Sequence, residues 1–436
     1  MGRAGRSRRE FLRVAAQLAS VLPFAAYPGC GGSSGASSTP TPTPLALTDD
    51  EFLDAVERAA FLYFWEQAGA ATGLVKDRAL AAGSDSRTLS SVAATGFGLA
   101  ALCIADQRGY MDSATVKARV LATLNTLLNQ PGENGFFYHF VDMNTGLRSG
   151  TSEVSSIDTA ILMCGVLTCR QHFQDAQVQS LANTLYSRVN WQWMLNGGMT
   201  LSQGWTPEGG FLGARWDTYS ELLMLYLLAI GSTTYPIPPS SWNQIARPTL
   251  TYQGLTYITN LNAPLFIHQF SHAWFDFRNR QDAFVNYFSN SVTATQAHKL
   301  FCLSLASQFA DYQQNLWGIS ASDTQNNGYQ AWGGPPSMGP IDGSVVPSAA
   351  AGSVPFLPAD CLAGMRNIQS QYPRAWQRYG YVGAFNPLTG WYDPDAVGIQ
   401  TGITMLMAEN QRTGFVWNTF MTSPEAQAAM AAVGFH

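Results

Sequence analysis

The chain has 436 residues, a formal net charge of −5, and 46% hydrophobic but only 12% charged residues. This composition supplies a large buried core. It argues against a nucleic-acid partner, because such partners are bound by basic side chains that displace the counterions of phosphates. Neutral ligands such as sugars need no such charge.

The N-terminal 30 residues predict an export signal. Residues 7–13 follow the twin-arginine pattern, and an apolar stretch at 14–26 is too short to span a bilayer. Cys30 resembles a lipidated cysteine, so membrane tethering and simple release both remain open. Residues 31–46 are rich in Gly, Ser, Thr and Pro and predict a tether to a single domain, 47–436. We expect an exported protein, either periplasmic or a membrane-anchored lipoprotein.

Two kinds of helix alternate along this domain. Amphipathic helices are predicted at 49–64, 113–129 and 175–190, and helices that are apolar on every face at 90–103, 154–169 and 221–230. Four more helices are predicted at 282–310, 359–371, 401–409 and 413–420. A helix that is apolar all round must be buried on every side. The alternation therefore predicts an inner ring wrapped by an outer ring, an all-α (α/α)6 toroid or barrel. We expect a monomer.

Few segments predict strands, and none of the cysteines predicts a metal site. Residues 136–140 and 255–258 have the composition of short β-hairpins on the loops. Besides Cys30 there are five cysteines, and no pair of them has the spacing of a zinc site. We therefore interpret these cysteines as buried thiols.

Two carboxylates stand at the beginning of helices that are apolar all round. Asp158 and Glu221 are each followed by about ten residues almost without charge. Side chains at such N-termini feel the positive end of the helix dipole, and burying a carboxylate requires partners or a raised pKa. Stabilisation of the first helical turn is the simpler interpretation. The repetition of the pattern predicts instead two acids at the rim of one central cavity, with Glu153 as a third candidate or a plain capping residue.

The loop before the third apolar helix carries aromatic and charged side chains. Trp205 and Glu208 lie in a glycine-rich segment, followed by Arg215, Trp216 and Tyr219. Aromatic faces stack on sugar rings, and paired carboxyl groups perform the acid/base chemistry of glycoside cleavage. The alternative is a capped helix start beside core aromatic residues. We interpret the loop as a sugar-binding element, with Glu208 as a mobile acid candidate.

A second group of polar and aromatic residues follows at 268–278. It contains His268, His272, Trp274, Asp276 and Arg278. The histidines are spaced as zinc ligands on a helix would be, but the glutamate of the HExxH motif is missing. Hydrogen bonds to sugar hydroxyls, or a polar strut in the core, are favoured over a metal. Asp276 and Arg278 are expected to form an ion pair.

These segments together resemble a known family. The matching segments, in order, are 61–65, 73–75, 94–97, 136–140, 157–160, 204–208, 219–221, 264–268, 271–274, 276–278, 316–318, 409–410, 412–414 and 416–417. The chain resembles the glucoamylase-like family that contains the bacterial β-1,2-glucanases of glycoside hydrolase family 144. It also resembles the related domain of cyclic β-1,2-glucan synthases.

The resemblance implies an (α/α)6 barrel that hydrolyses β-glucan, β-1,2-linked, without a metal or an organic cofactor. Asp158 and Glu221 match acidic positions of the family's cleft. The segments 205–208 and 268–278, and Trp317, match its substrate-binding loops. The sequence thus predicts an exported glycoside hydrolase whose partner is an oligo- or polysaccharide. Glu221 is the preferred general acid, Glu208 is second, and Asp158 activates water or orients the sugar.

One departure from the family falls near the C-terminus. The family reads Ile-Asp-Gln-Gly-Pro where this chain has Ile-Gln-Thr-Gly-Ile at 399–403, so Gln400 replaces an acid. Water would then be activated through a relay or by Asp393 or Asp395. Two alternatives follow: a glycan-binding protein that has lost catalysis, and a transglycosylase.

Overall fold

The computed structural model describes residues 47–260, 264–336, 339 and 341–436. The predicted export signal, the tether and Cys30 lie outside the described residues. Within these described ranges, no helix is long and apolar enough to cross a membrane.

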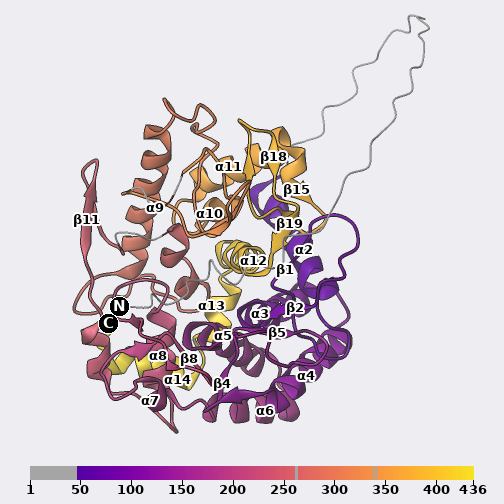
Figure 1. Ribbon diagram of the computed structural model, residues 1–436, viewed down its shortest axis with the longest axis vertical. Helices are drawn as coiled ribbons and strands as arrows, with labels where there is room; N and C mark the ends of the chain where they lie inside the picture. Colours follow the sequence, from indigo (N-terminus) through magenta and orange to yellow (C-terminus); the bar gives the residue numbers. More distant parts are fainter. Residues whose placement is uncertain (1–46, 261–263, 337–338, 340) are drawn as a thin grey trace, which may run out of the picture.

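Six helical elements form a closed inner ring (Figure 1). They are α3 (Val92–Arg108), α5 (Ser156–His172), α8 (Leu223–Gly231), the 3-10 pair η3 (Leu265–His268) and η4 (Phe270–Ala273), α10 (Pro347–Ala351) and α12 (Gly398–Arg412). α12 contacts α3 and α10, and α5 contacts both α3 and α8. η4 completes the ring: Met224 N–H donates to Ser271 Oγ at 3.0 Å, and Gln269 Nε2 donates to the carbonyl of Ala349 at 2.9 Å.

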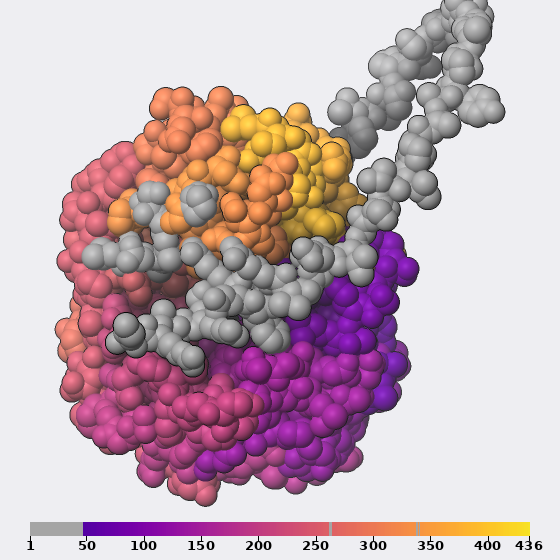
Figure 2. All heavy atoms as spheres, in the orientation of Figure 1, coloured from indigo at the N-terminus to yellow at the C-terminus, as the bar shows by residue number. Residues whose placement is uncertain are grey.

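An outer element precedes each inner one along the chain. These are α2 (Asp49–Glu66), α4 (Ser113–Asn129), α6 (Ala176–Ser187), η2 (Pro239–Gln244), α9 (Tyr287–Ser304) and α11 (Pro358–Gln371). The remaining helical segments are α7 (Trp191–Met194), η5 (Pro373–Ala375), α13 (Phe415–Phe420), which packs on α5, and α14 (Pro424–Ala432), which packs on α8. In Figure 2 the indigo N-terminal helices meet yellow-orange C-terminal segments, as neighbours in a closed ring must. The six pairs confirm the predicted (α/α)6 architecture.

Burial follows the two predicted helix types. In α3 every residue from Val92 to Ala105 is buried, whereas α4 buries only the stripe of Val116, Val120, Thr123, Leu124 and Leu127. α3 and α5 cross at two glycines, where a Cβ added to Gly165 would lie 2.1 Å from the carbonyl oxygen of Gly96. Only glycine allows this approach of two backbones.

The strands are short, and several end where an inner helix begins. They are β1 (Arg78–Leu80), β2 (Leu89–Ser91), β3 (Gly132–Glu133), β4 (Phe136–Phe137), β5 (Phe140–Asp142), β6 (Val154–Ser155), β7 (Leu201–Ser202), β8 (Gly204–Thr206), β9 (Gly210–Phe211), β10 (Arg215–Trp216), β11 (Thr249–Tyr252), β12 (Leu255–Ile258), β13 (Ser322–Thr324), β14 (Gly328–Gln330), β15 (Trp376–Gln377), β16 (Gly380–Tyr381), β17 (Phe385–Asn386), β18 (Trp391–Tyr392) and β19 (Asp395–Val397). β2 pairs with β5, β6 with β8 and β9, and β19 with β1. Because β2, β6 and β19 lead directly into α3, α5 and α12, they fix the N-terminal ends of these inner helices.

Some predicted boundaries are wrong. The helix predicted at 282–310 is shorter, because the Asp282 side chain accepts the N–H groups of Phe284 and Val285 in a turn before α9. The hairpin predicted around 136–140 is confirmed in part: β4 forms a short antiparallel hairpin with β3, whereas β5 pairs with the distant β2. The predicted hairpin strand at 255–258 is confirmed as β12, which pairs with β11.

Candidate active site

Asp158 and Glu221 line the same cavity. Asp158 lies in the first turn of α5, and Glu221 lies in the turn directly before α8, the next element of the ring. The cavity has a volume of about 320 Å³, including space open to solvent. Its lining consists of these two acids and Ile157, Ile161, Phe266, Phe270, Tyr329 and Ile399. The fold therefore brings together the two acids that the sequence placed at corresponding helix starts.

Asp158 is held by polar contacts at the N-terminus of α5. Its Oδ2 accepts the hydroxyl of Ser155 at 2.6 Å, and its own N–H donates to Ser155 Oγ at 3.3 Å. The Nε2 of His139 lies 3.5 Å from the same Oδ2. These hydrogen bonds and the positive end of the helix dipole stabilise a carboxylate, so Asp158 is suited to act as one.

Glu221 is anchored through its backbone. Its carbonyl accepts the hydroxyl of Ser271 at 2.7 Å, and this same serine accepts the N–H of Met224. Ser271 therefore ties the turn that carries Glu221 to η4 on the neighbouring side of the ring. The residue is 7% exposed.

The two histidines of the 268–278 segment are neutral struts. His268 Nδ1 lies 3.0 Å from the hydroxyl of Tyr219, and His272 Nε2 lies 3.0 Å from Ser291 Oγ. Burial lowers the pKa of each to about 3. Nowhere in the described ranges do three His, Cys, Asp or Glu side chains gather as metal ligands. Of the predicted roles, the polar strut fits this geometry.

The rest of that segment lies in the core or at its edge. Trp274 is fully buried, with its ring 4.9 Å from that of Phe97. Asp276 and Arg278 form the predicted ion pair, with N–O distances of 2.9 and 3.0 Å, and the guanidinium lies over the ring of Trp417. Trp317 is buried too, with the ammonium of Lys299 5.8 Å from its ring centre. None of the four predicted residues in this group lines the cavity of Asp158 and Glu221.

The 204–216 loop packs beside the start of α5. Trp205 lies in β8, which pairs with β6, and its ring contacts that of Trp193. Trp216 Nε1 donates to Ser156 Oγ at 2.9 Å. Arg215 donates to the Thr200 hydroxyl at 2.9 Å and to the Leu195 carbonyl at 2.5 Å, so its guanidinium braces the loop.

Glu208 lies at the surface of the same loop. Its side chain is 59% exposed and pairs with Arg148 through both oxygens, at 2.6 and 2.9 Å. The hydrogen bonds from Arg148 lower the pKa of Glu208. A general acid instead needs to hold its proton near the working pH.

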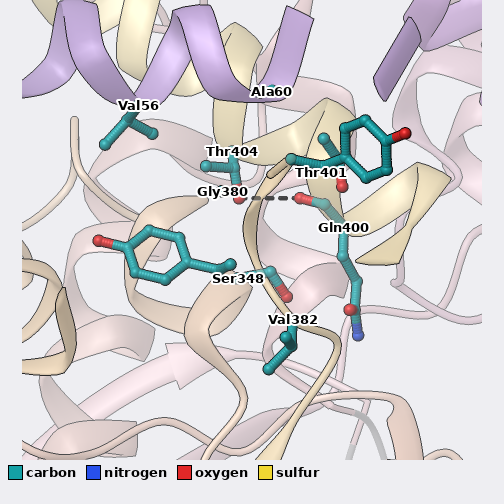
Figure 3. Close-up of a pocket in the computed structure, with 10 residues that line it drawn as sticks. Val56, Ala60, Ser348, Gly380, Val382, Gln400, Thr401 and Thr404 are labelled. Atoms are coloured by element: carbon teal, nitrogen blue, oxygen red, sulfur yellow. Dashed lines mark hydrogen bonds between the residues drawn. The ribbon is translucent and has the colours of Figure 1, made fainter. Parts of the chain in front are cut away.

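Gln400 lies in the first turn of α12 and faces a different cavity. Its Nε2 donates to the carbonyl of Ala321 at 2.8 Å. Figure 3 shows it with Thr404, whose hydroxyl donates to the Gln400 carbonyl. The cavity has a volume of about 290 Å³, including space open to solvent. That cavity is lined by residues of α2, α10, α12 and the 379–382 segment. Only the neighbouring Ile399 reaches the cavity of Asp158 and Glu221.

The acids just before α12 are held in a buried charged cluster. Asp395 accepts two bonds from Arg87, at 2.8 and 2.5 Å. Asp393 is buried, and burial together with the charges of Asp323 and Asp395 raises its pKa to about 8. Arg78 pairs with Asp323 on the same side. Neither Asp393 nor Asp395 lines the Asp158–Glu221 cavity.

The sequence did not single out several residues around Asp158 and Glu221. Phe266, Phe270 and Tyr329 supply aromatic surface to the cavity, and His139 contacts Asp158. The one sequence signal for His139 was its isolated position in the aromatic run 136–140.

Comparisons with known proteins identify similar sequences and similar folds. The family described as "Putative glucoamylase" matches residues 213–424. The exo beta-1,2-glucooligosaccharide sophorohydrolase (non-reducing end) of Parabacteroides distasonis is 26% identical over 439 residues, 92% of this chain and 60% of that protein. The chain therefore spans about 60% of the length of this relative.

Solved structures match over nearly the whole domain. An endo-β-1,2-glucanase from Chitinophaga pinensis, in complex with sophorotriose and glucose, has a TM-score of 0.81 at 25% identity, covering 90% of this chain and 99% of that chain. A structure described as a "putative glucoamylase" from Bacteroides uniformis has a TM-score of 0.83 at 25% identity, covering 90% and 98%. The protein has the (α/α)6 fold of these glucoamylase-like structures. The resemblance to the family that contains β-1,2-glucanases is confirmed.

Proposed function

We propose that this protein is a glycoside hydrolase that cleaves β-1,2-glucan or its oligosaccharides. The observation that carries the proposal is that Asp158 and Glu221, from neighbouring elements of the inner ring, line one cavity together with Phe266, Phe270 and Tyr329. Glycoside hydrolysis uses two carboxyl groups that face the sugar, and aromatic side chains supply surfaces on which the sugar is bound. Relatives named as a sophorohydrolase and an endo-β-1,2-glucanase support this substrate class.

In this proposal Glu221 is the general acid and Asp158 acts as a carboxylate. Glu221 gives its proton to the oxygen of the leaving sugar as the bond to the anomeric carbon breaks. Water attacks that carbon, and Asp158 accepts the proton of the water or orients the sugar. The hydroxyl of Ser155 and the helix dipole favour this charged role for Asp158. Glu208 is less suited to be the acid, because Arg148 lowers its pKa.

A panel of glucans tests the substrate class. The protein is incubated with linear β-1,2-glucan, β-1,3-glucan and β-1,4-glucan oligosaccharides, and the products are separated by size. We expect shorter oligosaccharides from the β-1,2-linked substrate alone. Glu221→Gln should bind without cleavage, whereas the matched control Glu133→Gln, on β3, should cleave as the unaltered protein does.

The same panel distinguishes the two rival functions. Binding of β-1,2-glucan without any product would indicate a glycan-binding protein. Products that are larger or cyclic would indicate a transglycosylase.

We also propose that the chain acts after twin-arginine export. The pattern at residues 7–13 and the tether at 31–46 support this location. Replacing both Arg8 and Arg9 with lysine should retain the protein in the cytoplasmic fraction of an expressing bacterium. Replacing Cys30 with serine should release it from membranes if the cysteine carries lipid, and should change nothing if it does not.

A further inference from the structure

His139 lies at the point where two inner helices begin. It is located between β4 and β5, its carbonyl accepts the N–H of Val92 at 3.1 Å, and its N–H donates to the carbonyl of Glu153 at 2.8 Å. These bonds tie it to the starts of α3 and of β6, which leads into α5. Its side chain is buried, and its ring stacks on that of Phe140 with centroids 3.8 Å apart. The imidazole is thus fixed in position and in orientation.

The two ring nitrogens of His139 face two carboxyl groups. Nδ1 lies 3.0 Å from Oε1 of Glu153, and Nε2 lies 3.5 Å from Oδ2 of Asp158. An imidazole that carries a proton on each nitrogen is a donor on both sides, whereas a neutral ring donates to one side only. Two carboxylates on opposite nitrogens therefore suit the positively charged ring.

Glu153, His139 and Asp158 lie in this order from the solvent to the cavity. The Glu153 side chain is 30% exposed, while those of His139 and Asp158 are 5% and 4% exposed. The next charges outward are Arg148, which attracts Glu153, and Glu208, which pairs with Arg148. On the inner side, the Ser155 hydroxyl donates to the same Oδ2 of Asp158 that faces His139. Two contacts on one oxygen fix the rotation of this carboxylate.

We propose that His139 and Glu153 form a positioning pair for Asp158. Glu153 holds the imidazole, and the imidazole holds the carboxylate of Asp158 in one orientation toward the cavity. The pair itself does not touch the substrate, and this role rests on the proposed function of Asp158.

Steady-state kinetics test this role. His139→Gln should lower kcat about tenfold or more, since misplacing a catalytic group is costly, and should leave KM within about twofold. Glu153→Gln should cause a smaller loss of kcat, again with KM little changed. A folded His139→Gln with unchanged kcat, or with a loss that lies in KM instead, would overturn the proposal.

His172 offers a matched control. It lies at the far end of α5, and its Nε2 lies 2.6 Å from Oδ2 of Asp106, so it is also a partly buried histidine on a carboxylate. His172→Gln should leave kcat and KM unchanged. If both histidine variants lose activity equally, the effect is a general structural one and the proposal is wrong.

A spectroscopic measurement separates this proposal from the proposed function. The chain has six histidines, and the ¹⁵N signals missing in His139→Gln identify those of His139. Because Glu153 and Asp158 contact its two nitrogens, these signals should shift in Glu153→Gln and in Asp158→Asn. Signals that are insensitive to both variants would contradict the pair, whether or not the protein cleaves glucan. An unaltered protein that cleaves no glucan would instead contradict the proposed function alone.

Discussion

Arg148 binds Glu208 through two nitrogens, which lie 2.6 and 2.9 Å from the two carboxylate oxygens. The pair lies at the surface beside the loop that the sequence marked as sugar-binding. The hydrogen bonds from Arg148 lower the pKa of Glu208, so this carboxyl group is charged at neutral pH. Because a general acid must hold a proton to donate, the pairing with Arg148 favours Glu221 over Glu208 for that role.

Replacing Glu208 should therefore leave the chemical step intact. We expect Glu208→Gln to keep kcat within about threefold, because an exposed ion pair contributes little, and to change mainly KM. Steady-state kinetics on β-1,2-glucan oligosaccharides measure both constants. A loss of kcat in Glu208→Gln as large as in Glu221→Gln would make Glu208 the acid.

Restoring an acid at position 400 should not increase activity. The Gln400 amide donates to the Ala321 carbonyl in a cavity separate from that of Asp158 and Glu221. Gln400→Glu removes this donor and should lower the free energy of unfolding by about 1–3 kcal/mol, with no gain in kcat. Denaturant unfolding and kinetics of the same variant check this. A clear rise in kcat would indicate that Gln400 replaces a catalytic base.

Buried acids should make the fold less stable as the pH rises. Burial and the charge of Glu409 raise the pKa of Glu57 from 4.5 to about 8. Between these two values the folded state holds a proton that the unfolded state has lost, so the free energy of unfolding falls with rising pH. Asp393, with a pKa near 8, acts in the same direction. The buried neutral His268 and His272 act in the opposite direction at pH values below their ordinary pKa of 6.5, because there only the unfolded state protonates them. Thermal unfolding between about pH 7 and pH 8.5, where the acids alone decide the slope, should therefore show a falling Tm.

Glu57→Gln should flatten this dependence. The amide keeps an acceptor for Tyr110 and Arg412 and no longer titrates. Its Tm should therefore exceed that of the unaltered protein at pH 8.5 and fall less with pH. Asp49→Asn, on the exposed face of the same helix, should keep the original slope. An equal slope in Glu57→Gln would contradict the protonated state assigned to Glu57.

The crossing of α3 and α5 should tolerate no larger residue. A Cβ at position 165 would lie 2.1 Å from the carbonyl oxygen of Gly96, so Gly165→Ala must push two inner helices apart. We expect a loss of about 3 kcal/mol or more in the free energy of unfolding. Gly213→Ala, where an added Cβ meets nothing within 4 Å, should change the stability little. Guanidinium unfolding compares the two, and equal stabilities would contradict the packing described.

The sequence predicted the helices that have a clear apolar pattern, either one apolar stripe or an apolar surface on every face. The bounds of α4 match the prediction at both ends, and α3 and α5 were recognised because each is apolar on every face. The inner elements α10, η3 and η4 were not recognised. α10 has only five residues and is too short to show a helical period, and η3 and η4 are 3-10 helices, whose period differs from that of an α-helix.

The site could be predicted only in part, for physical reasons. Asp158 and Glu221 were identifiable because each stands alone before an apolar helix. The contact of His139 with Asp158 joins residues 19 positions apart through the pairing of neighbouring strands, which no local pattern reveals. Ile399 and Gln400 differ by one residue, yet they line different cavities, since successive helical side chains point about 100° apart.

The most direct test of the account is the product analysis of Glu221→Gln on linear β-1,2-glucan. The unaltered protein should release short oligosaccharides. Glu221→Gln should lose at least about 100-fold in kcat, because a positioned general acid contributes that much, while still binding the glucan. Cleavage by Glu221→Gln at the unaltered rate would contradict the assignment of the cavity between α5 and α8 as the active site.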